Sequence, residues 1–164
     1  MKKIILMLML CAPMTMFAQK FGKLNTQTIM NTLPDVAKAN GELEALRKQK
    51  ENEMKGMQDE LSRKNQEYEK SKSSMNPSKQ KETEEELQGL YQKMQQAYQD
   101  AQKELQKKSE ELMEPISTKV RNAINAVGKA GAYTFIFEGT TDALVYVGDN
   151  VKDITAEVKA KVGK

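Results

Sequence analysis

Apolar residues in the middle of the chain recur at alternating intervals of three and four positions. Up to residue 75 the strictest track steps by seven, and a companion track runs beside it. Its members are Met54, Leu61, Tyr68 and Met75, with Leu43 and Met57 on the companion track. Within residues 77–115 the same alternation runs through Leu87, Tyr91, Met94, Tyr98, Ala101, Leu105, Lys108 and Leu112. This spacing is typical of helices that pack along an apolar seam in a coiled coil.

A single Asn-Pro pair interrupts this pattern at its midpoint. Proline disfavours helical geometry at the residue before it, so the first helix must end before Pro77. Asn76 can then cap a second helix that has Pro77 at its first position. The two helices, 34–74 and 77–115, have nearly equal lengths, about 60 Å each at ~1.5 Å per residue. The sequence therefore predicts an antiparallel hairpin with its tip near residues 74–78.

The two apolar stripes also match when one of them is reversed. One fold-back point aligns both tracks if the numbers of paired residues sum to about 151–152. The resulting pairs are Leu61–Tyr91, Met54–Tyr98, Met57–Met94 and Leu46–Leu105. This agreement favours a hairpin over one unbroken helix.

The two ends of the chain have a different pattern, which predicts short strands. Residues 20–25, KFGKLN, read as a strand, and a turn of helix follows with Ile29 and Met30 facing inward. Near the other end, the β-branched and aromatic residues of YTFIFE (133–138) predict a buried strand. LVYVGD (144–149) predicts another strand after a turn.

Helical periodicity returns on both sides of these C-terminal strands. The first such segment follows the hairpin, where Pro115 is expected to kink the chain and Gly128 and Gly131 to end the helix. Its apolar positions are Ile116, Val120, Ile124 and Val127. The second segment, DITAEVKAKV, predicts a closing helix capped by Asp153.

Together these elements predict an α+β fold with two parts. A small β-sheet body of about three strands comprises residues 19–33 and 116–164, and the helical hairpin arm, residues 34–115, is inserted between its strands. A sheet of this size with open edges is marginal by itself, and oligomerisation would cover it.

The first 18 residues have the pattern of a cleaved secretory signal peptide. Two lysines precede a run of only eight apolar residues, which is too short to cross a bilayer. Ala18 supplies a small residue before a cut, so we expect export to the periplasm with cleavage near Ala18. The alternative is a lipoprotein modified at Cys11, although the bulky Leu10 before it is unlike such sites.

The residue types of the remaining chain exclude most catalytic chemistry. The sequence contains no histidine, and its one cysteine lies in the segment expected to be removed. Nucleophile–base pairs and zinc or haem sites therefore lack their usual groups. The carboxylates of ETEEEL (82–87) read as a solvated helix face, and no glycine-rich phosphate loop is present. We expect no enzyme activity, no cofactor, no metal and no nucleic-acid partner.

Charge is distributed unevenly along the predicted arm. Loss of the two N-terminal lysines lowers the basic count from 26 to 24 against 23 acidic residues, so the mature chain is near neutral. Residues 62–81 nevertheless hold six basic residues against two glutamates. The basic residues are Arg63, Lys64, Lys70, Lys72, Lys79 and Lys81. This tip is either an ordinary solvated turn or a surface that contacts anionic lipid headgroups or acidic protein segments.

Methionine is frequent outside the signal segment, mostly on or near the predicted arm. These residues are Met30, Met54, Met57, Met75, Met94 and Met113. They either fill the seam or offer an adaptable surface to many partners.

The layout resembles the Skp/OmpH family of periplasmic chaperones. The most specific part is the block YTFIFEGTTDALVYVGDNVKDITAEV, in which two strands lead into Asp153-Ile154-Thr155; the strand KFGKLN and the long hairpin complete the likeness. The resemblance implies a homotrimer in which the sheets join in a small body and the hairpins surround a cavity. It also implies that unfolded outer-membrane β-barrel proteins are held there without ATP.

The apolar residues of the C-terminal strands are the expected trimer contacts. They are Phe135, Phe137, Val145 and Val147. The expected function is an ATP-independent holdase, which could also contact anionic membrane surfaces transiently. The alternative is a structural or adaptor coiled coil of the cell envelope. A chaperone needs apolar residues outside the seam of its hairpin, whereas an adaptor needs one fixed patch.

Overall fold

The structure is a computed structural model that describes residues 19–139 and 144–163. The predicted signal peptide, residues 1–18, lies outside the described residues. The chain divides into two compact units, Ile29–Arg121 and the combination of Met1–Thr28 with Asn122–Lys164. We call these the hairpin unit and the body unit.

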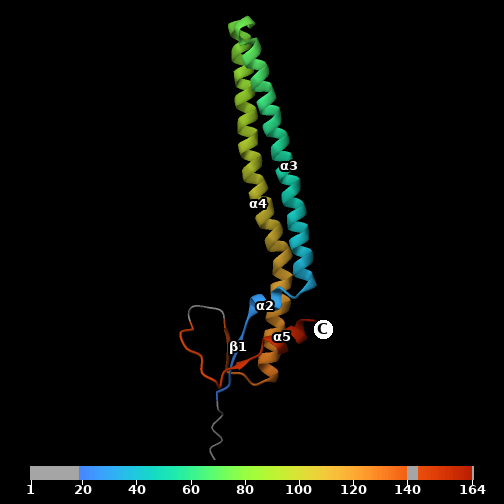
Figure 1. Ribbon diagram of the computed structural model, residues 1–164, viewed down its shortest axis with the longest axis vertical. Helices are drawn as coiled ribbons and strands as arrows, with labels where there is room; N and C mark the ends of the chain where they lie inside the picture. The colour runs from blue at the N-terminus through green and yellow to red at the C-terminus, as the bar shows by residue number, and fades with distance from the viewer. Residues whose placement is uncertain (1–18, 140–143, 164) are drawn as a thin grey trace, which may run out of the picture. The chain divides into compact units, whose positions relative to one another are not determined.

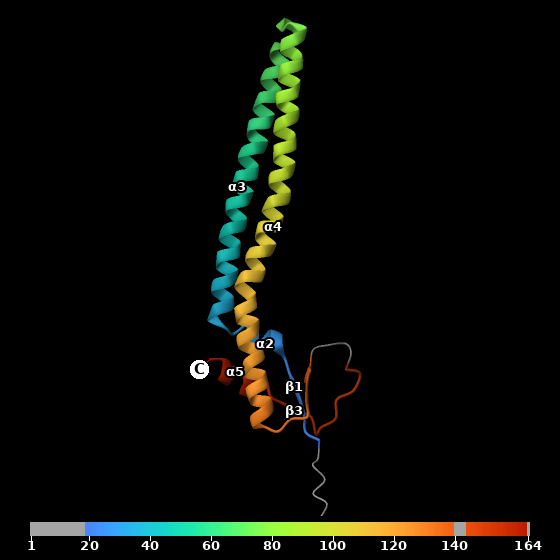
Figure 2. The same cartoon turned by 180° about the vertical axis from the view of Figure 1, so that it is seen from behind.

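The hairpin unit contains the predicted antiparallel helices. Helix α3 spans Pro34–Ser71, a short 3₁₀ turn η1 spans Lys72–Ser74, and helix α4 spans Pro77–Ala130. Figures 1 and 2 both show α3 and α4 side by side up to the turn. Oδ1 of Asn76 accepts a hydrogen bond from the backbone N–H of Lys79 at 2.9 Å. The predicted hairpin and its Asn-Pro cap are therefore confirmed.

Pro115, where a kink was predicted, lies inside a helix. Helix α4 continues through Pro115 without interruption. Proline lacks the N–H that would bond the carbonyl of Glu111, but both residues are exposed on the surface. Water can solvate the freed carbonyl there, so the helix tolerates the proline.

The helix ends directly before Gly131, as predicted, but not at Gly128. Gly128 remains helical, and α4 ends at Ala130. The residue with a left-handed backbone is Ala132, with φ of 52°, and the N–H of Tyr133 donates to the carbonyl of Gly128 at 3.0 Å. Gly128 allows close packing against the sheet, since a Cβ there would lie 3.0 Å from Cδ1 of Ile136 and that side chain would have to shift.

The body unit contains a three-stranded parallel sheet. Strand β1 spans Phe21–Leu24, β2 spans Phe135–Glu138 and β3 spans Lys152–Asp153, in the order β2-β1-β3. Both outer strands run parallel to β1. The hairpin enters the chain between β1 and β2, as predicted. The sheet therefore joins segments from both ends of the sequence.

The two faces of the sheet differ in their surroundings. On one face Gly22 and Leu24 of β1 are buried, and Ile136 of β2 packs against Gly128 of α4. On the other face Phe135 and Phe137 are 57% and 38% exposed. The prediction of a buried β2 was wrong, because β2 lies at an edge of the sheet and one of its faces is uncovered in the single chain.

The predicted strand LVYVGD is also absent. Among the described residues of this segment, 144–149, no strand forms, and Val145 is 97% exposed. The second edge of β1 is occupied by β3, which comes later in the sequence. Favourable β propensity does not form a strand without a neighbouring strand to bond with.

A short helix, α5, closes the chain at Thr155–Val162. The carboxylate of Asp153 accepts the backbone N–H of Thr155 at 2.9 Å. Hydrogen bonds from the side chain and backbone of Thr155 lower the pKa of Asp153. Asp153 thus satisfies a free N–H at the start of the helix, although Ile154 occupies the capping position itself.

Each unit has its own small set of buried apolar residues. In the body unit these are Leu24, Ala123, Ile154, Val158 and Val162. In the hairpin unit they are Ile29, Leu33, Val36, Ala39, Tyr68, Ala101, Ile116 and Val120. Ile29 belongs to the short helix α2, Thr26–Met30, where it was predicted to face inward. Across the described part of the chain, no helix combines the length and the apolar character that crossing a membrane requires.

Candidate functional site

Heptad spacing allows either of two sets of α4 residues to face α3 in the seam. The predicted register placed Tyr91 and Tyr98 in the seam, but they are 49% and 58% exposed. Leu90 and Ala97, one position earlier, are the more buried side chains. Both choices satisfy the heptad spacing. The aliphatic residues pack between the helices, and the two tyrosines keep their hydroxyl groups in water.

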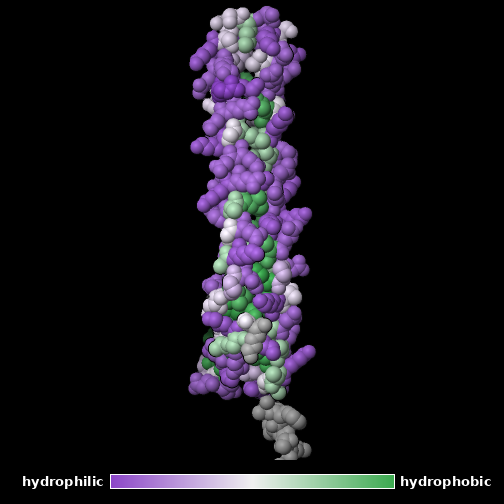
Figure 3. Space-filling view, turned by 90° about the vertical axis from the view of Figure 1, so that its right-hand side faces the viewer, coloured by the Kyte–Doolittle hydropathy of each residue, from purple (hydrophilic) through white to green (hydrophobic). Residues whose placement is uncertain are grey.

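Polar contacts across the seam confirm the predicted antiparallel alignment. They occur at intervals from the base to the tip and join residues whose numbers have a nearly constant sum. The pairs are Asp35–Lys119, Glu42–Lys108, Lys50–Glu104, Lys64–Glu86 and Tyr68–Glu84. On the face drawn in Figure 3, apolar residues form an interrupted line along the hairpin, with hydrophilic residues on either side.

Lys50 is a charged residue at a seam position. Its side chain is only 18% exposed, and its ammonium group lies 2.8 Å from Glu104 and 3.4 Å from Glu53. The hydrogen bond to Glu104 is the main cause of the raised pKa of Lys50. A lysine here contributes less apolar contact than a leucine would, so the helices are held less by burial in this stretch.

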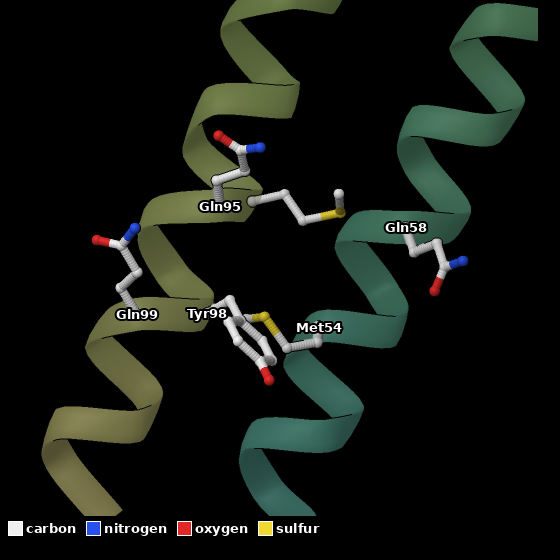
Figure 4. A pocket seen from close by; sticks show the side chains of 6 residues that line it. Met54, Gln58, Gln95, Tyr98 and Gln99 are labelled. Atoms are coloured by element: carbon white, nitrogen blue, oxygen red, sulfur yellow. The ribbon is translucent and has the colours of Figure 1, made fainter.

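A groove opens between the helices next to this lysine. It has a volume of about 490 Å³ and is lined by Met54, Gln58, Met94, Gln95, Tyr98 and Gln99. Figure 4 shows Met54 and Tyr98 side by side between the helices, with Gln95 and Gln99 extending from α4 and Gln58 from α3. A second hollow of about 410 Å³ shares Met54, Gln58 and Tyr98 and extends to Leu105. We call the first hollow the Met54–Tyr98 groove.

The basic residues of the tip are largely paired with carboxylates of the same hairpin. Five of the six predicted contact residues form ion pairs, four of them with the acidic run that follows the turn on α4. The pairs are Arg63–Glu67, Lys64–Glu86, Lys72–Glu84, Lys79–Glu82 and Lys81–Glu85. Lys70 is exposed on the last turn of α3. The folded hairpin therefore brings negative charge to the tip that the sequence window of residues 62–81 does not contain.

The uncovered face of the sheet carries a cluster of three phenylalanines. The ring centroids of Phe21, Phe135 and Phe137 lie 6.2 Å apart in every pair. The structure thus brings two predicted contact residues together with Phe21, which the sequence did not single out. Of the other two, Val145 is nearly fully exposed and Val147 is partly exposed.

This architecture matches a known family over almost the whole chain. The sequence profile of the outer membrane proteins described as OmpH-like matches residues 20–162. The chain belongs to the OmpH-like family.

A solved structure of an OmpH-like protein supports the fold of this family member. It is named a candidate outer membrane chaperone and comes from Caulobacter crescentus CB15. The two chains share 15% sequence identity and superpose with a TM-score of 0.73, covering 88% of this chain and 83% of the other. No curated protein matches the sequence significantly.

In this OmpH-like chain, the groove is the feature that sequence reasoning missed. The apolar pattern assigns Met54, Met94 and Tyr98 to the seam and gives the glutamines no role. The signal that could have found the groove is the clustering of glutamines around tyrosine and methionine on both helices. Within the described residues, no group of three or more metal-ligating side chains is arranged to hold a metal ion.

Proposed function

We propose that this OmpH-like protein is a periplasmic, ATP-independent holdase that binds unfolded outer-membrane β-barrel proteins and keeps them from aggregating. One observation carries the proposal: the hairpin exposes large apolar side chains outside its seam. Met57, Tyr91 and Tyr98 are between 39% and 58% exposed. A hairpin that served only as a spacer would gain nothing from this exposure, whereas a holdase needs apolar surface for an unfolded chain.

Assembly as a homotrimer is part of the same proposal. The phenylalanine cluster and Val145 leave apolar surface on a sheet of three short strands, and two further copies of the chain would cover it. Three hairpins held together in this way would surround one client. The likeness in fold to a candidate outer membrane chaperone is in line with this arrangement.

The decisive test is a dilution assay without ATP. A urea-unfolded outer-membrane barrel protein is diluted into buffer with the mature protein at one trimer per client, and light scattering is followed over time. Suppressed scattering is expected, while an equal mass of an unrelated neutral coiled coil should have no effect. Unchanged scattering would contradict the holdase proposal and favour a structural or adaptor role.

A further inference from the structure

We propose that the mature chain begins at Gln19 and that this glutamine is modified to 5-oxoproline. A signal peptidase hydrolyses the bond between Ala18 and Gln19 during export, and the new α-amine then closes a ring with the side-chain carboxamide of the same residue. The proposal rests on the proposed function, because only an exported protein loses a signal peptide.

Lys20, the residue directly after this glutamine, is tied to the body unit by three contacts. Its carbonyl accepts a hydrogen bond from the backbone N–H of Thr134 at 2.8 Å. Its ammonium group donates to the carbonyl of Gly131 at 2.9 Å and lies 4.4 Å from the centre of the Tyr133 ring. These contacts hold Lys20 against the segment that connects α4 to β2.

Gln19 lies just outside this anchor and is exposed to solvent. After cleavage at Ala18, a single residue extends beyond Lys20, so its α-amine and its carboxamide are free to approach each other. The reaction takes place within one residue and closes a five-membered lactam, which gives the amine a high effective concentration. The position of the anchor therefore leaves the reacting groups accessible while the rest of the strand stays folded.

The ring closure needs no further reactant. The lone pair of the α-amine forms a bond to Cδ of Gln19. The carboxamide nitrogen leaves with the electron pair of its bond to Cδ, takes up the amine proton and departs as ammonia. No group is oxidised or reduced, and the product is a neutral lactam without a primary amine.

A blocked chain end protects the strand that follows. Strand β1 begins at Phe21, two residues after Gln19, and lies between β2 and β3. Both outer strands pair with β1. An aminopeptidase that advanced from the chain end would soon remove the strand that holds the sheet together. Such enzymes require a free α-amine, which the lactam lacks.

The lactam also removes a positive charge from the proposed trimer interface. A free α-amine is mostly protonated at neutral pH. Two residues of chain span at most about 7 Å, so this charge would lie close to Phe21. Phe21 belongs to the phenylalanine cluster that two further copies of the chain would cover. An unpaired charge buried there would weaken the assembly, and a neutral end avoids this cost.

The direct test is mass spectrometry of the protein isolated from the periplasm of the cells that naturally produce it. The intact mass should equal that of residues 19–164 less one molecule of ammonia. Fragmentation of the N-terminal peptide should assign the loss to Gln19, and pyroglutamyl peptidase should convert this peptide into one that begins at Lys20. A recombinant chain with an unmodified Gln19, handled in parallel, should keep its full mass, which excludes cyclisation during preparation.

Gln19→Glu is the matched variant for the role of the blocked end. Its carboxylate is close in shape to the carboxamide but is a much poorer acceptor for the amine, so the variant should keep a free α-amine. Aminopeptidase should then shorten Gln19→Glu and leave the wild type intact. Gln66→Glu makes the same change on the hairpin and should stay resistant. Equal resistance of all three proteins would overturn the protective role.

The outcomes separate this proposal from the holdase proposal. A native chain that begins with unmodified Gln19, or at another residue such as a lipid-modified Cys11, overturns the cyclisation. Suppressed scattering by such a chain would still support the holdase. An oxoproline end on a protein that does not suppress scattering supports the cyclisation and rejects the holdase. A native protein that retains residues 1–18 would contradict both the cyclisation and the proposed processing on export.

Discussion

The hydroxyl of Tyr68 on α3 donates a hydrogen bond to Oε1 of Glu84 on α4 at 2.5 Å. The ammonium group of Lys72 lies 5.1 Å from the centre of the same ring, and only 4% of Tyr68 is exposed to solvent. These contacts join the two helices directly below the turn. The bond to Glu84 is the main cause that raises the pKa of Tyr68 to about 12.

This bond predicts a pH-dependent stability of the tip. The folded-state pKa of Tyr68 lies above the ordinary value of 10.0, so its stabilising effect is complete below pH 10 and is lost as pH rises towards 12. Tyr68→Phe should lower Tm by a few degrees at about pH 8, and the difference from the wild type should shrink at about pH 11. Thermal unfolding followed by circular dichroism measures this, with Tyr91→Phe as a control that should leave Tm unchanged. A Tyr68→Phe difference that is constant with pH would contradict the assignment.

A second effect on stability is expected from substitution of Gly22, in the body unit. A Cβ at this position would lie 3.1 Å from the ring of Tyr133 and 3.5 Å from Ile136. Gly22→Ala should therefore reduce the free energy of unfolding by about 1–3 kcal/mol, the usual effect of overpacking. Urea denaturation gives this value.

The control for Gly22→Ala is a glycine with free space around it. Gly56 lies in α3, and a Cβ added there would meet no atom within 4 Å, so Gly56→Ala should stabilise the helix by about 0.5–1 kcal/mol. Destabilisation by both substitutions to the same extent would mean that local packing around Gly22 is not the cause.

We expect the phenylalanine cluster to form the interface of the proposed trimer. Phe137→Asp places a charge beside Phe21 and Phe135, where a partner subunit would bury it without compensation. Sedimentation velocity should show monomers for this variant and trimers for Tyr91→Asp, which adds the same charge to the hairpin. A trimeric Phe137→Asp protein of unchanged stability would place the interface elsewhere.

We expect the outer half of the hairpin to be dispensable for folding of the body unit. Deleting Leu61–Tyr91 and closing the gap with a short turn joins positions that the cross-seam pairs place opposite one another. The shortened protein should remain folded and assemble like the full-length chain, because the body unit has its own buried residues. Circular dichroism and sedimentation test this, and an unfolded or disassembled product would show that the outer half is required.

We expect the basic residues of the tip to have a small, salt-dependent effect on the association rate. Replacing Lys70, Lys72, Lys79 and Lys81 with Gln leaves Glu82, Glu84 and Glu85 without their ion-pair partners, so the tip becomes negative. Association with an acidic client or with anionic vesicles should slow at low salt and recover at high salt, because the Debye length is only ~8 Å at physiological salt. Stopped-flow mixing measures the rate. If the variant associates at the wild-type rate at low salt, the tip is an ordinary solvated turn.

Much of the fold could be predicted from the sequence because the deciding signals are local. Heptad spacing, the Asn-Pro pair and matched segment lengths indicated the hairpin, its turn and its alignment, and KFGKLN indicated β1. The same spacing could not choose between Leu90 and Tyr91, since both registers repeat every seven residues. Only packing against α3 decides that the aliphatic Leu90, and not the phenol ring of Tyr91, faces the seam.

The sequence by itself determined an α+β chain with an inserted antiparallel hairpin and without the residues of common catalytic sites. The tertiary structure decided which residues are covered. It left Phe135 and Phe137 exposed on an edge strand, kept LVYVGD out of the sheet, and paired Lys64 and Lys72 with glutamates across the turn. It also brought Met54, Gln58 and Tyr98 to one groove. The physical reason is that burial and ion pairing depend on which segments pack together in the folded chain. A local sequence pattern does not identify the segment that will pack against it.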